Sequence, residues 1–157
     1  MEDGPDVDRL RGVRMSDAEI DAFLAEQGVG VLALADDGNA YAIPVSFGYA
    51  DGRVYLVYFR FADRPTKEAY SDATETACLA VYEVESPLRW RSVLAFGPLE
   101  RVNPDRWDEV GAAMSDNAWS PDLSSIGPRR GTVRTYVMPV EEATGLEGPA
   151  YASGGEE

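Results

Sequence analysis

The strongest constraint on the fold is a pair of Asp-Gly dipeptides, Asp37-Gly38 and Asp51-Gly52, within a stretch of apolar, strand-like sequence. Asp-Gly between two such runs favours a tight β-hairpin, because the turn needs residues that adopt positive φ. The first dipeptide separates Val29–Ala35 from Ala40–Tyr49, and the second separates Ala40–Tyr49 from Val54–Phe59. The sequence therefore predicts two hairpins in series, which form a three-stranded antiparallel meander.

Further strand-like runs follow along the chain. Thr76–Val84 and Trp90–Val102 are joined by a short turn, and Thr132–Val140 is the last predicted strand. Pro44 cannot donate a ladder hydrogen bond, so its strand is expected at a sheet edge or at a bulge. Gly97-Pro98 predicts a bulge or kink in an otherwise long strand. Together these runs predict a small β-barrel.

Helices and loops are predicted around the strands. Ser16-Asp17-Ala18-Glu19 is a capping box, which indicates a short helix that ends at Gly28. Pro104–Met114 alternates charged and apolar side chains and is typical of an amphipathic helix. Asn117–Gly131 is rich in glycine, proline and serine and is predicted to be a loop.

A length of 157 residues indicates one domain that is large enough to bury a core. Residues 1–15 are predicted to be a flexible acidic arm, and residues 148–157 a disordered tail. No apolar run approaches the ~20 residues that span a bilayer. The N-terminal stretch lacks the basic and apolar regions of a signal peptide. We therefore expect a cytoplasmic protein with no membrane partner.

The charge balance is strongly acidic, with 28 acidic and 14 basic residues and a formal charge of −14. Lys67 is the only lysine, although lysine is normally among the commonest residues. This combination indicates a halophilic protein from a high-salt cytoplasm, where salt screens the self-repulsion. A merely acidic soluble protein is the alternative. Nucleic acid is not an expected partner, since no basic stripe could neutralise its phosphates.

The chain has no histidine and one cysteine, Cys78. These counts exclude Ser-His-Asp and Cys-His catalysis, histidine metal sites, cysteine clusters and an internal disulfide. Cys78 lies in an apolar strand-like run and is expected to be buried and inert. Residues 28–33 match the string G-x-G-x-x-A, but a helix precedes them and a hairpin follows. A dinucleotide-binding Rossmann site is therefore not expected.

A candidate binding site follows the meander. Asp63-Arg64-Pro65 looks like a helix entry, with proline at an early helical position, and Thr66 and Lys67 come next. Backbone amides at a helix start, beside Arg64, Thr66 and Lys67, could hold an anion or a phosphate group. A solvated helix cap is the alternative, and the residues alone leave both interpretations open.

The order of these motifs resembles the pyridoxamine 5′-phosphate oxidase-like FMN-binding split-barrel family. The resemblance covers about residues 16–147 and includes Thr144-Gly145, which looks like the Thr-Gly ending of the family. It rests on the capped helix, a Gly-Val-Gly-Val-Leu strand, a Pro-Val-Ser-Phe hairpin, a lysine-bearing helix and an Arg-Ser-Val strand. It implies a mainly β fold with flanking helices, specifically a six-stranded antiparallel split β-barrel. It also implies a homodimer, with one FMN in each of two clefts at the subunit interface.

The resemblance assigns nine residues to the cofactor. Those along the isoalloxazine ring are Ile43, Pro44 and Val45, followed on the next strand by Val57 and Tyr58. Those at the phosphate are Arg64, Thr66 and Lys67. Ser92 would reach the ring or the ribityl chain.

The resemblance implies an FMN-dependent oxidoreductase that acts on a small-molecule substrate. Val57 stands where many members carry a histidine, and the C-terminal tryptophan and arginine of true pyridoxamine-phosphate oxidases have no counterpart. Synthesis of pyridoxal phosphate is therefore not expected. The alternatives are an F420-dependent reductase of the same fold and a non-catalytic flavin-binding or stress-related protein. Without histidine, proton transfer would fall to water, Tyr58, a carboxylate or the flavin nitrogens.

Overall fold

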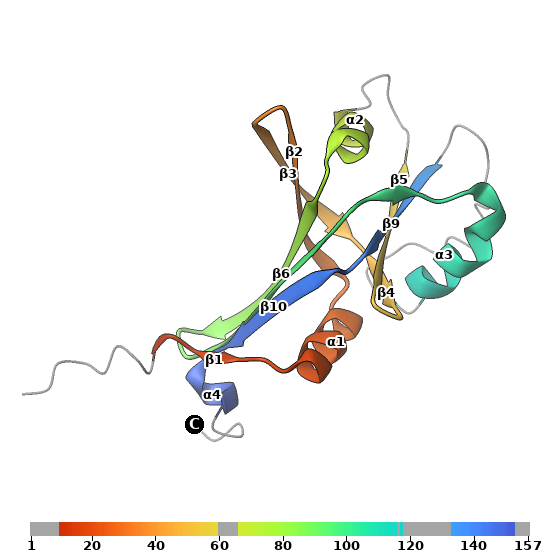
Figure 1. The fold of residues 1–157 in the computed structure, drawn as a ribbon. Helices are drawn as coiled ribbons and strands as arrows, with labels where there is room; N and C mark the ends of the chain where they lie inside the picture. Colours follow the sequence, from red (N-terminus) through yellow and green to blue (C-terminus); the bar gives the residue numbers. More distant parts are fainter. Residues whose placement is uncertain (1–9, 60–65, 116, 118–132, 153–157) are drawn as a thin grey trace, which may run out of the picture.

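A computed structural model describes residues 10–59, 66–115, 117 and 133–152 (Figure 1). Two antiparallel sheets make up most of the described chain, and short helices flank them. The strands are β1 (Val13–Arg14), β2 (Val29–Asp36), β3 (Asn39–Ser46), β4 (Gly48–Ala50), β5 (Arg53–Phe59), β6 (Ala77–Ser86), β7 (Arg89–Gly97), β8 (Glu100–Arg101), β9 (Val133–Pro139) and β10 (Glu142–Glu147). The helices are α1 (Asp17–Glu26), α2 (Thr66–Ala73), α3 (Trp107–Ser115), α4 (Pro149–Ala152) and the 3-10 helix Pro104–Arg106.

The larger sheet has the strand order β1-β10-β7-β6-β2-β3, and the smaller sheet has the order β4-β5-β9-β8. All of these pairings are antiparallel. One main hydrophobic cluster draws side chains from both sheets and from α1, and a second cluster lies between the smaller sheet and α3. The prediction of a mainly β split barrel with flanking helices is confirmed.

Both predicted Asp-Gly turns are present. Asp37 and Gly38 have φ of 50° and 79°, and Asp51 and Gly52 have φ of 52° and 73°. Positive φ at both central residues is the signature of the tight turn whose twist matches its strands. The two hairpins are β2–β3 and β4–β5. Pro44 lies on β3, which is an edge strand of the larger sheet, as predicted.

The predicted meander is wrong in one respect, because its middle strand is broken. β3 ends at Ser46 and β4 begins at Gly48, so the two halves of Ala40–Tyr49 belong to different sheets. The Phe47 amide at the break donates to the carbonyl of Gly28. The Asn117 side-chain amide donates to the carbonyls of both Gly28 and Phe47. These hydrogen bonds take the place of strand-to-strand hydrogen bonds at the point where the chain passes from one sheet to the other.

The chain changes sheets again after β7. Gly97 ends that strand, and β8 pairs with β9 in the smaller sheet, so the predicted kink at Gly97-Pro98 is confirmed. A Cβ atom at Gly97 would lie 1.9 Å from the carbonyl oxygen of Pro139. Glycine is therefore required where the two strands approach each other.

The predicted capping box is present at the start of α1. The Glu19 amide donates to the Ser16 hydroxyl, and the Ser16 amide donates to the Glu19 carboxylate. The amphipathic segment predicted over 104–114 forms the 3-10 helix and α3. Of the predicted loop over 117–131, only Asn117 lies within the described residues. None of the helices in the described ranges is long and apolar enough to cross a bilayer.

Both ends of the domain differ from the sequence-based boundaries. Val13 and Arg14, which were assigned to the arm, form β1 and pair with Glu147 and Leu146 of β10. Four residues of the predicted tail form α4, in which the Ala150 amide donates to the carbonyl of Leu88. Short sequence patterns do not reveal these elements, because long-range pairing stabilises them.

Candidate functional site

Helix α2 lies beside the end of β2 and the strands of the smaller sheet (Figure 1), and its C-terminal end is tied to β2. The hydroxyl of Thr74, just after the helix, donates to the Ala35 carbonyl, and the Ala35 amide donates to that hydroxyl, each over 3.0 Å. This pair of bonds fixes the end of the helix. The position of its first turn, which carries Thr66 and Lys67, follows from it.

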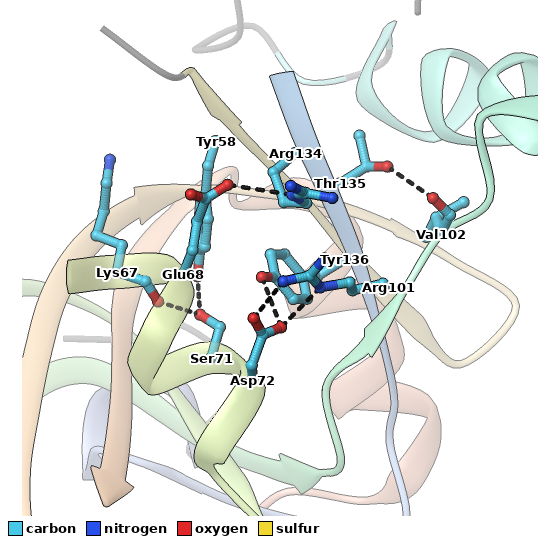
Figure 2. A network of polar contacts seen from close by, with 10 residues as sticks. All are labelled: Tyr58, Lys67, Glu68, Ser71, Asp72, Arg101, Val102, Arg134, Thr135 and Tyr136. Atoms are coloured by element: carbon cyan, nitrogen blue, oxygen red, sulfur yellow. Dashed lines mark hydrogen bonds and ion pairs between the residues drawn. The ribbon is translucent and has the colours of Figure 1, made fainter. Parts of the chain in front are cut away.

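The side of α2 that faces the smaller sheet carries two paired carboxylates (Figure 2). Arg134 of β9 donates from Nε to Glu68 over 3.2 Å. Arg101 of β8 donates to Asp72 through Nε over 2.9 Å and also through Nη2. The Tyr136 hydroxyl donates to the same carboxylate over 3.0 Å. The helix is thus bound to two strands of the smaller sheet by charge-assisted hydrogen bonds.

These contacts shift the protonation equilibria of the groups involved. The Arg101 hydrogen bonds, helped by Tyr136, hold the pKa of Asp72 below its ordinary value despite partial burial. Burial and the adjacent Asp72 carboxylate raise the pKa of the Tyr136 phenol. The hydrogen bond to Asp72 raises the pKa of Arg101. Asp72 and Arg101 are therefore both charged at neutral pH, and each offsets the charge of the other.

Lys67 lies on a different side of the helix. Its side chain is exposed and extends away from the Arg101–Asp72 pair (Figure 2). The ammonium nitrogen lies 5.3 Å from the centroid of the Tyr58 ring, within the range of a cation–π contact. In the described ranges, no carboxylate lies within ion-pair distance of this ammonium group. Among the described residues, the charge of Lys67 is therefore not offset by a carboxylate in contact with it.

The Tyr58 side chain lies beneath α2 and is 4% exposed. Its hydroxyl is 2.9 Å from the Ser71 hydroxyl, and the Ser71 hydroxyl donates to the Lys67 carbonyl over 2.7 Å. Nearby, the rings of Tyr41 on β3 and Tyr70 on α2 stack with centroids 4.7 Å apart and planes 11° apart. β3, β5 and α2 therefore meet around a group of aromatic side chains.

The structure brings three of the nine sequence-predicted residues, Tyr58, Thr66 and Lys67, to this place. Thr66 and Lys67 form the first turn of α2, and Lys67 lies over Tyr58. Ile43 and Val45 are half-buried and pack against the main hydrophobic cluster that contains Tyr58. Thr66, Lys67 and Tyr58 thus lie together, whereas Ile43 and Val45 lie further along β3, level with Leu32 and Gly30 of β2.

Other predicted residues do not join this group within one chain. Pro44 points to the opposite face of β3 from Ile43 and Val45, because successive side chains alternate along a strand. Val57 likewise points away from Tyr58 and packs against the second cluster. Arg64 lies outside the described residues.

Ser92 is also distant from Lys67 within one chain. It lies on β7 opposite Tyr82 of β6, and the register places Tyr82 level with Val29, at the start of β2. Helix α2 is tied to Ala35, six residues further along β2, which corresponds to about 20 Å. The register therefore separates Ser92 from the end of α2 that is tied to β2.

Sequence reasoning missed the residues that hold α2 in place. These are Glu68, Ser71, Asp72, Arg101, Arg134 and Tyr136. The spacing of four residues between Glu68 and Asp72 puts both carboxylates on one side of the helix, which is a signal that the sequence does contain. Nothing in the sequence shows that their partners come from β8 and β9, because those contacts join residues far apart in the chain.

The larger sheet has one face that we call the outer face. Its exposed apolar side chains are Val29, Tyr82, Val84, Leu94 and Leu146, with exposed fractions of 41–68%. The register puts them on one side of the sheet, opposite the fully buried Leu32, Leu79 and Val93. Apolar patches of this kind mark interaction surfaces more often than ordinary solvent-facing sheet.

Three more predicted residues lie on the outer face. Pro44 and Ser92 occupy its positions on β3 and β7, and Cys78 occupies one on β6. Cys78 is half-buried, not fully buried as predicted, and its burial raises the pKa of the thiol. The thiolate is therefore disfavoured at neutral pH.

Comparison with known protein families identifies the family to which this arrangement of two sheets and a lysine-bearing helix belongs. The sequence model of one family, pyridoxamine 5′-phosphate oxidase, matches residues 16–147, which is most of the chain. The chain belongs to this family. The family resemblance and its split-barrel fold are therefore confirmed. A search of curated proteins found no match.

Solved structures of this fold resemble the chain at low sequence identity. An FAD-binding protein from Mesorhizobium loti shares 23% identity with a TM-score of 0.68, over 87% of this chain and 98% of that one. An FAD and heme binding protein from Mycobacterium smegmatis shares 18% identity with a TM-score of 0.67, over 85% and 71%. An FAD binding protein from the same organism shares 15% identity with a TM-score of 0.66, over 87% and 98%. At these identities the likeness establishes the fold.

Proposed function

We propose that this member of the pyridoxamine 5′-phosphate oxidase family binds FMN and acts as an oxidoreductase on a small molecule. The observation that carries the proposal is Lys67, an exposed cation in the first turn of α2. Among the described residues it has no carboxylate partner, and its helix packs against β3 through the stacked rings of Tyr70 and Tyr41. A flavin mononucleotide has one anionic end and one flat, largely apolar end, so this pairing of features suits it.

The residues present fit FMN in chemical type. Lys67 and the α2 amides would hold the phosphate, helped by the Thr66 hydroxyl, since helix starts and ammonium groups both favour anions. Ile43 and Val45 would supply apolar contact for the ring. FMN would supply the redox chemistry, and the protein would supply binding and orientation. By the family resemblance, Arg64 would add a second cation.

The charge inventory favours FMN over F420, which carries an acidic tail. Arg101 and Arg134 lie near α2, but each already donates to a carboxylate on that helix. The chain has one lysine, and its formal charge is −14. A cofactor with several carboxylates would meet repulsion that few free cations could offset. F420 is therefore the weaker alternative.

We also propose that the protein is a homodimer in which the outer face is the subunit interface. A second copy would cover the exposed apolar side chains of that face, and one self-complementary patch can serve both subunits. Pro44 and Ser92 lie on this face, so dimerisation would bring them into a cleft shared by two chains. This would account for their separation from Lys67 within one chain.

The cofactor proposal is tested by an absorbance spectrum of the purified protein in molar salt, before and after FMN is added and the sample desalted. A retained, perturbed flavin band near one per subunit is expected. If no flavin is retained while F420 is, the alternative cofactor holds. Retention of neither would contradict the proposal, and a haem band would identify another cofactor.

Catalysis is tested separately on the flavin-loaded protein. Turnover of NAD(P)H or another donor well above that of free FMN would support an oxidoreductase. Loaded protein that is silent with a broad panel of donors and acceptors would favour a non-catalytic flavin-binding role. The first test decides binding, and the second decides activity.

A further inference from the structure

The position of Tyr58 assigns it a role that differs from contact with the flavin ring. Its ring is 4% exposed and lies under α2, so little of it faces an external ligand. Besides the Tyr136 ring, which packs against it with centroids 5.2 Å apart, its two contacts are both with α2: the Lys67 ammonium over the ring, and the Ser71 hydroxyl next to the phenol oxygen. Both contacts involve Lys67, the first directly and the second because the Ser71 hydroxyl donates to the Lys67 carbonyl.

The direction of the hydrogen bonds follows from the number of protons available. A serine hydroxyl has one proton, and Ser71 donates it to the Lys67 carbonyl over 2.7 Å. The 2.9 Å contact between Ser71 and Tyr58 must therefore have the phenol as donor. Burial raises the pKa of the Tyr58 phenol, so the donor stays protonated over the physiological range. The chain of bonds runs from Tyr58 through Ser71 to the backbone of Lys67.

These hydrogen bonds act on the backbone of Lys67, and the contact with the Tyr58 ring acts on its side-chain ammonium group. A carboxylate beside Lys67 would hold the ammonium group but would also neutralise it. An aromatic face holds the cation through its quadrupole and leaves the net charge in place. The two acids that the structure describes on α2 beside it, Glu68 and Asp72, are bound by Arg134 and Arg101 on the side of the smaller sheet.

We propose that Tyr58 is a positioning residue that holds Lys67, in its backbone and in its side chain, for a phosphate group. This inference deepens the proposed function and rests on it. Under this inference Tyr58 does not contact the flavin directly. Nor does it donate a proton to the cofactor, because the Tyr58 phenol donates to Ser71.

The test compares the affinities for FMN and for riboflavin, which lacks the phosphate, in Tyr58→Phe. This variant keeps the ring and removes only the hydroxyl. We expect FMN binding to weaken roughly three- to tenfold, the loss of one hydrogen bond in the chain. Riboflavin binding should stay within about twofold, because the phosphate site does not contact it. Ser71→Ala should reproduce the same pattern.

Tyr136→Phe is the matched control. It also removes a phenol that donates to α2, but its acceptor is Asp72 and not a group linked to Lys67. The ratio of FMN to riboflavin affinity should stay at the wild-type value in this variant. In a Lys67→Met background, Tyr58→Phe should no longer change FMN affinity, since the residue through which it acts is gone.

Several results would overturn the inference. Equal weakening of FMN and riboflavin by Tyr58→Phe would mean that Tyr58 contacts the ring system. An unchanged ratio, or the same change in Tyr136→Phe, would remove the specific link to Lys67. Wild-type protein that binds neither ligand would refute the proposed function itself, and the inference with it.

A second readout needs no flavin. The chain has one lysine, so selective ¹⁵N-lysine labelling gives one backbone amide signal, that of Lys67. Titration with inorganic phosphate should shift this signal in the wild type and require several-fold more phosphate in Tyr58→Phe or Ser71→Ala. Identical titration curves in all three proteins would contradict the positioning role, even if one variant proved too unstable for the flavin assay.

Discussion

A single charge on the outer face should split the proposed homodimer. Leu94 is central to this face, opposite Ala80 of β6 and Thr144 of β10, and it is 41% exposed in the single chain. In a dimer built on the outer face, this side chain would lose most of its remaining contact with water. The substitution Leu94→Asp puts a carboxylate at that point.

The expected effect follows from the exposed fraction. Full burial of a leucine side chain is worth about 1.5–3 kcal/mol, so the exposed 41% corresponds to about 0.6–1.2 kcal/mol. A two-fold interface contains the residue twice, which gives about 1.2–2.4 kcal/mol for the dimer. Since 1.4 kcal/mol is a factor of ten, the dimer dissociation constant should rise at least about tenfold. Desolvation of two carboxylates would add to this.

Sedimentation velocity in molar salt, over a range of protein concentrations, measures this shift. Leu88→Asp is the control, because Leu88 is 46% exposed but lies in the turn between β6 and β7. Circular dichroism checks that both variants are folded. A dimer constant that is unchanged in Leu94→Asp, or equally changed in Leu88→Asp, would refute the outer face as the interface.

Four further predictions follow from the structure. Lys67→Ala should weaken FMN binding by about 1–3 kcal/mol through loss of a charge-assisted hydrogen bond, and an unchanged fluorescence titration would remove Lys67 from the phosphate site. Asn117→Ala should lower the free energy of unfolding in urea by about 1–3 kcal/mol, because the buried Phe47 carbonyl loses this donor and the Gly28 carbonyl keeps only the Phe47 amide, and a neutral result would contradict this. The pKa of Asp72 is lowered in the folded protein, so its contribution is present above its ordinary value of 3.8 and lost as the pH falls below it. The Tm of Asp72→Asn should therefore fall less than that of the wild type between pH 6 and pH 3, and parallel curves would refute the assignment. The wild-type Tm should rise from dilute buffer to molar salt, and a constant value would argue against a halophilic protein.

Much of the fold could be predicted because its signals are local. Asp37-Gly38 and Asp51-Gly52 need only their own backbone preferences to form tight turns. The capping box at Ser16 and Glu19 is likewise complete within one helical turn. The order of such local motifs was enough to indicate the family, although no single motif was specific.

The rest depends on contacts between residues far apart in the chain. The break at Phe47 is stabilised by Asn117, which lies about seventy positions later, so the run 40–49 looks continuous in the sequence. Motif matching also treats neighbouring strand residues as one unit. Alternation along each strand instead sends Pro44 and Val57 to different faces from Ile43 and Tyr58.

The strand order has a consequence for synthesis on the ribosome. β5, in the middle of the smaller sheet, pairs with β9, and β7 of the larger sheet pairs with β10, so both sheets need strands that follow β1 to β8 in the sequence. β1 also pairs with β10, and among the strands that the structure describes it has no other partner. The nascent chain must therefore present unpaired strand edges until β9 and β10 have been made, a state that is prone to aggregation. A formal charge of −14 would help to keep that state dispersed, so the acidic composition can serve the unfinished chain as well as the finished protein.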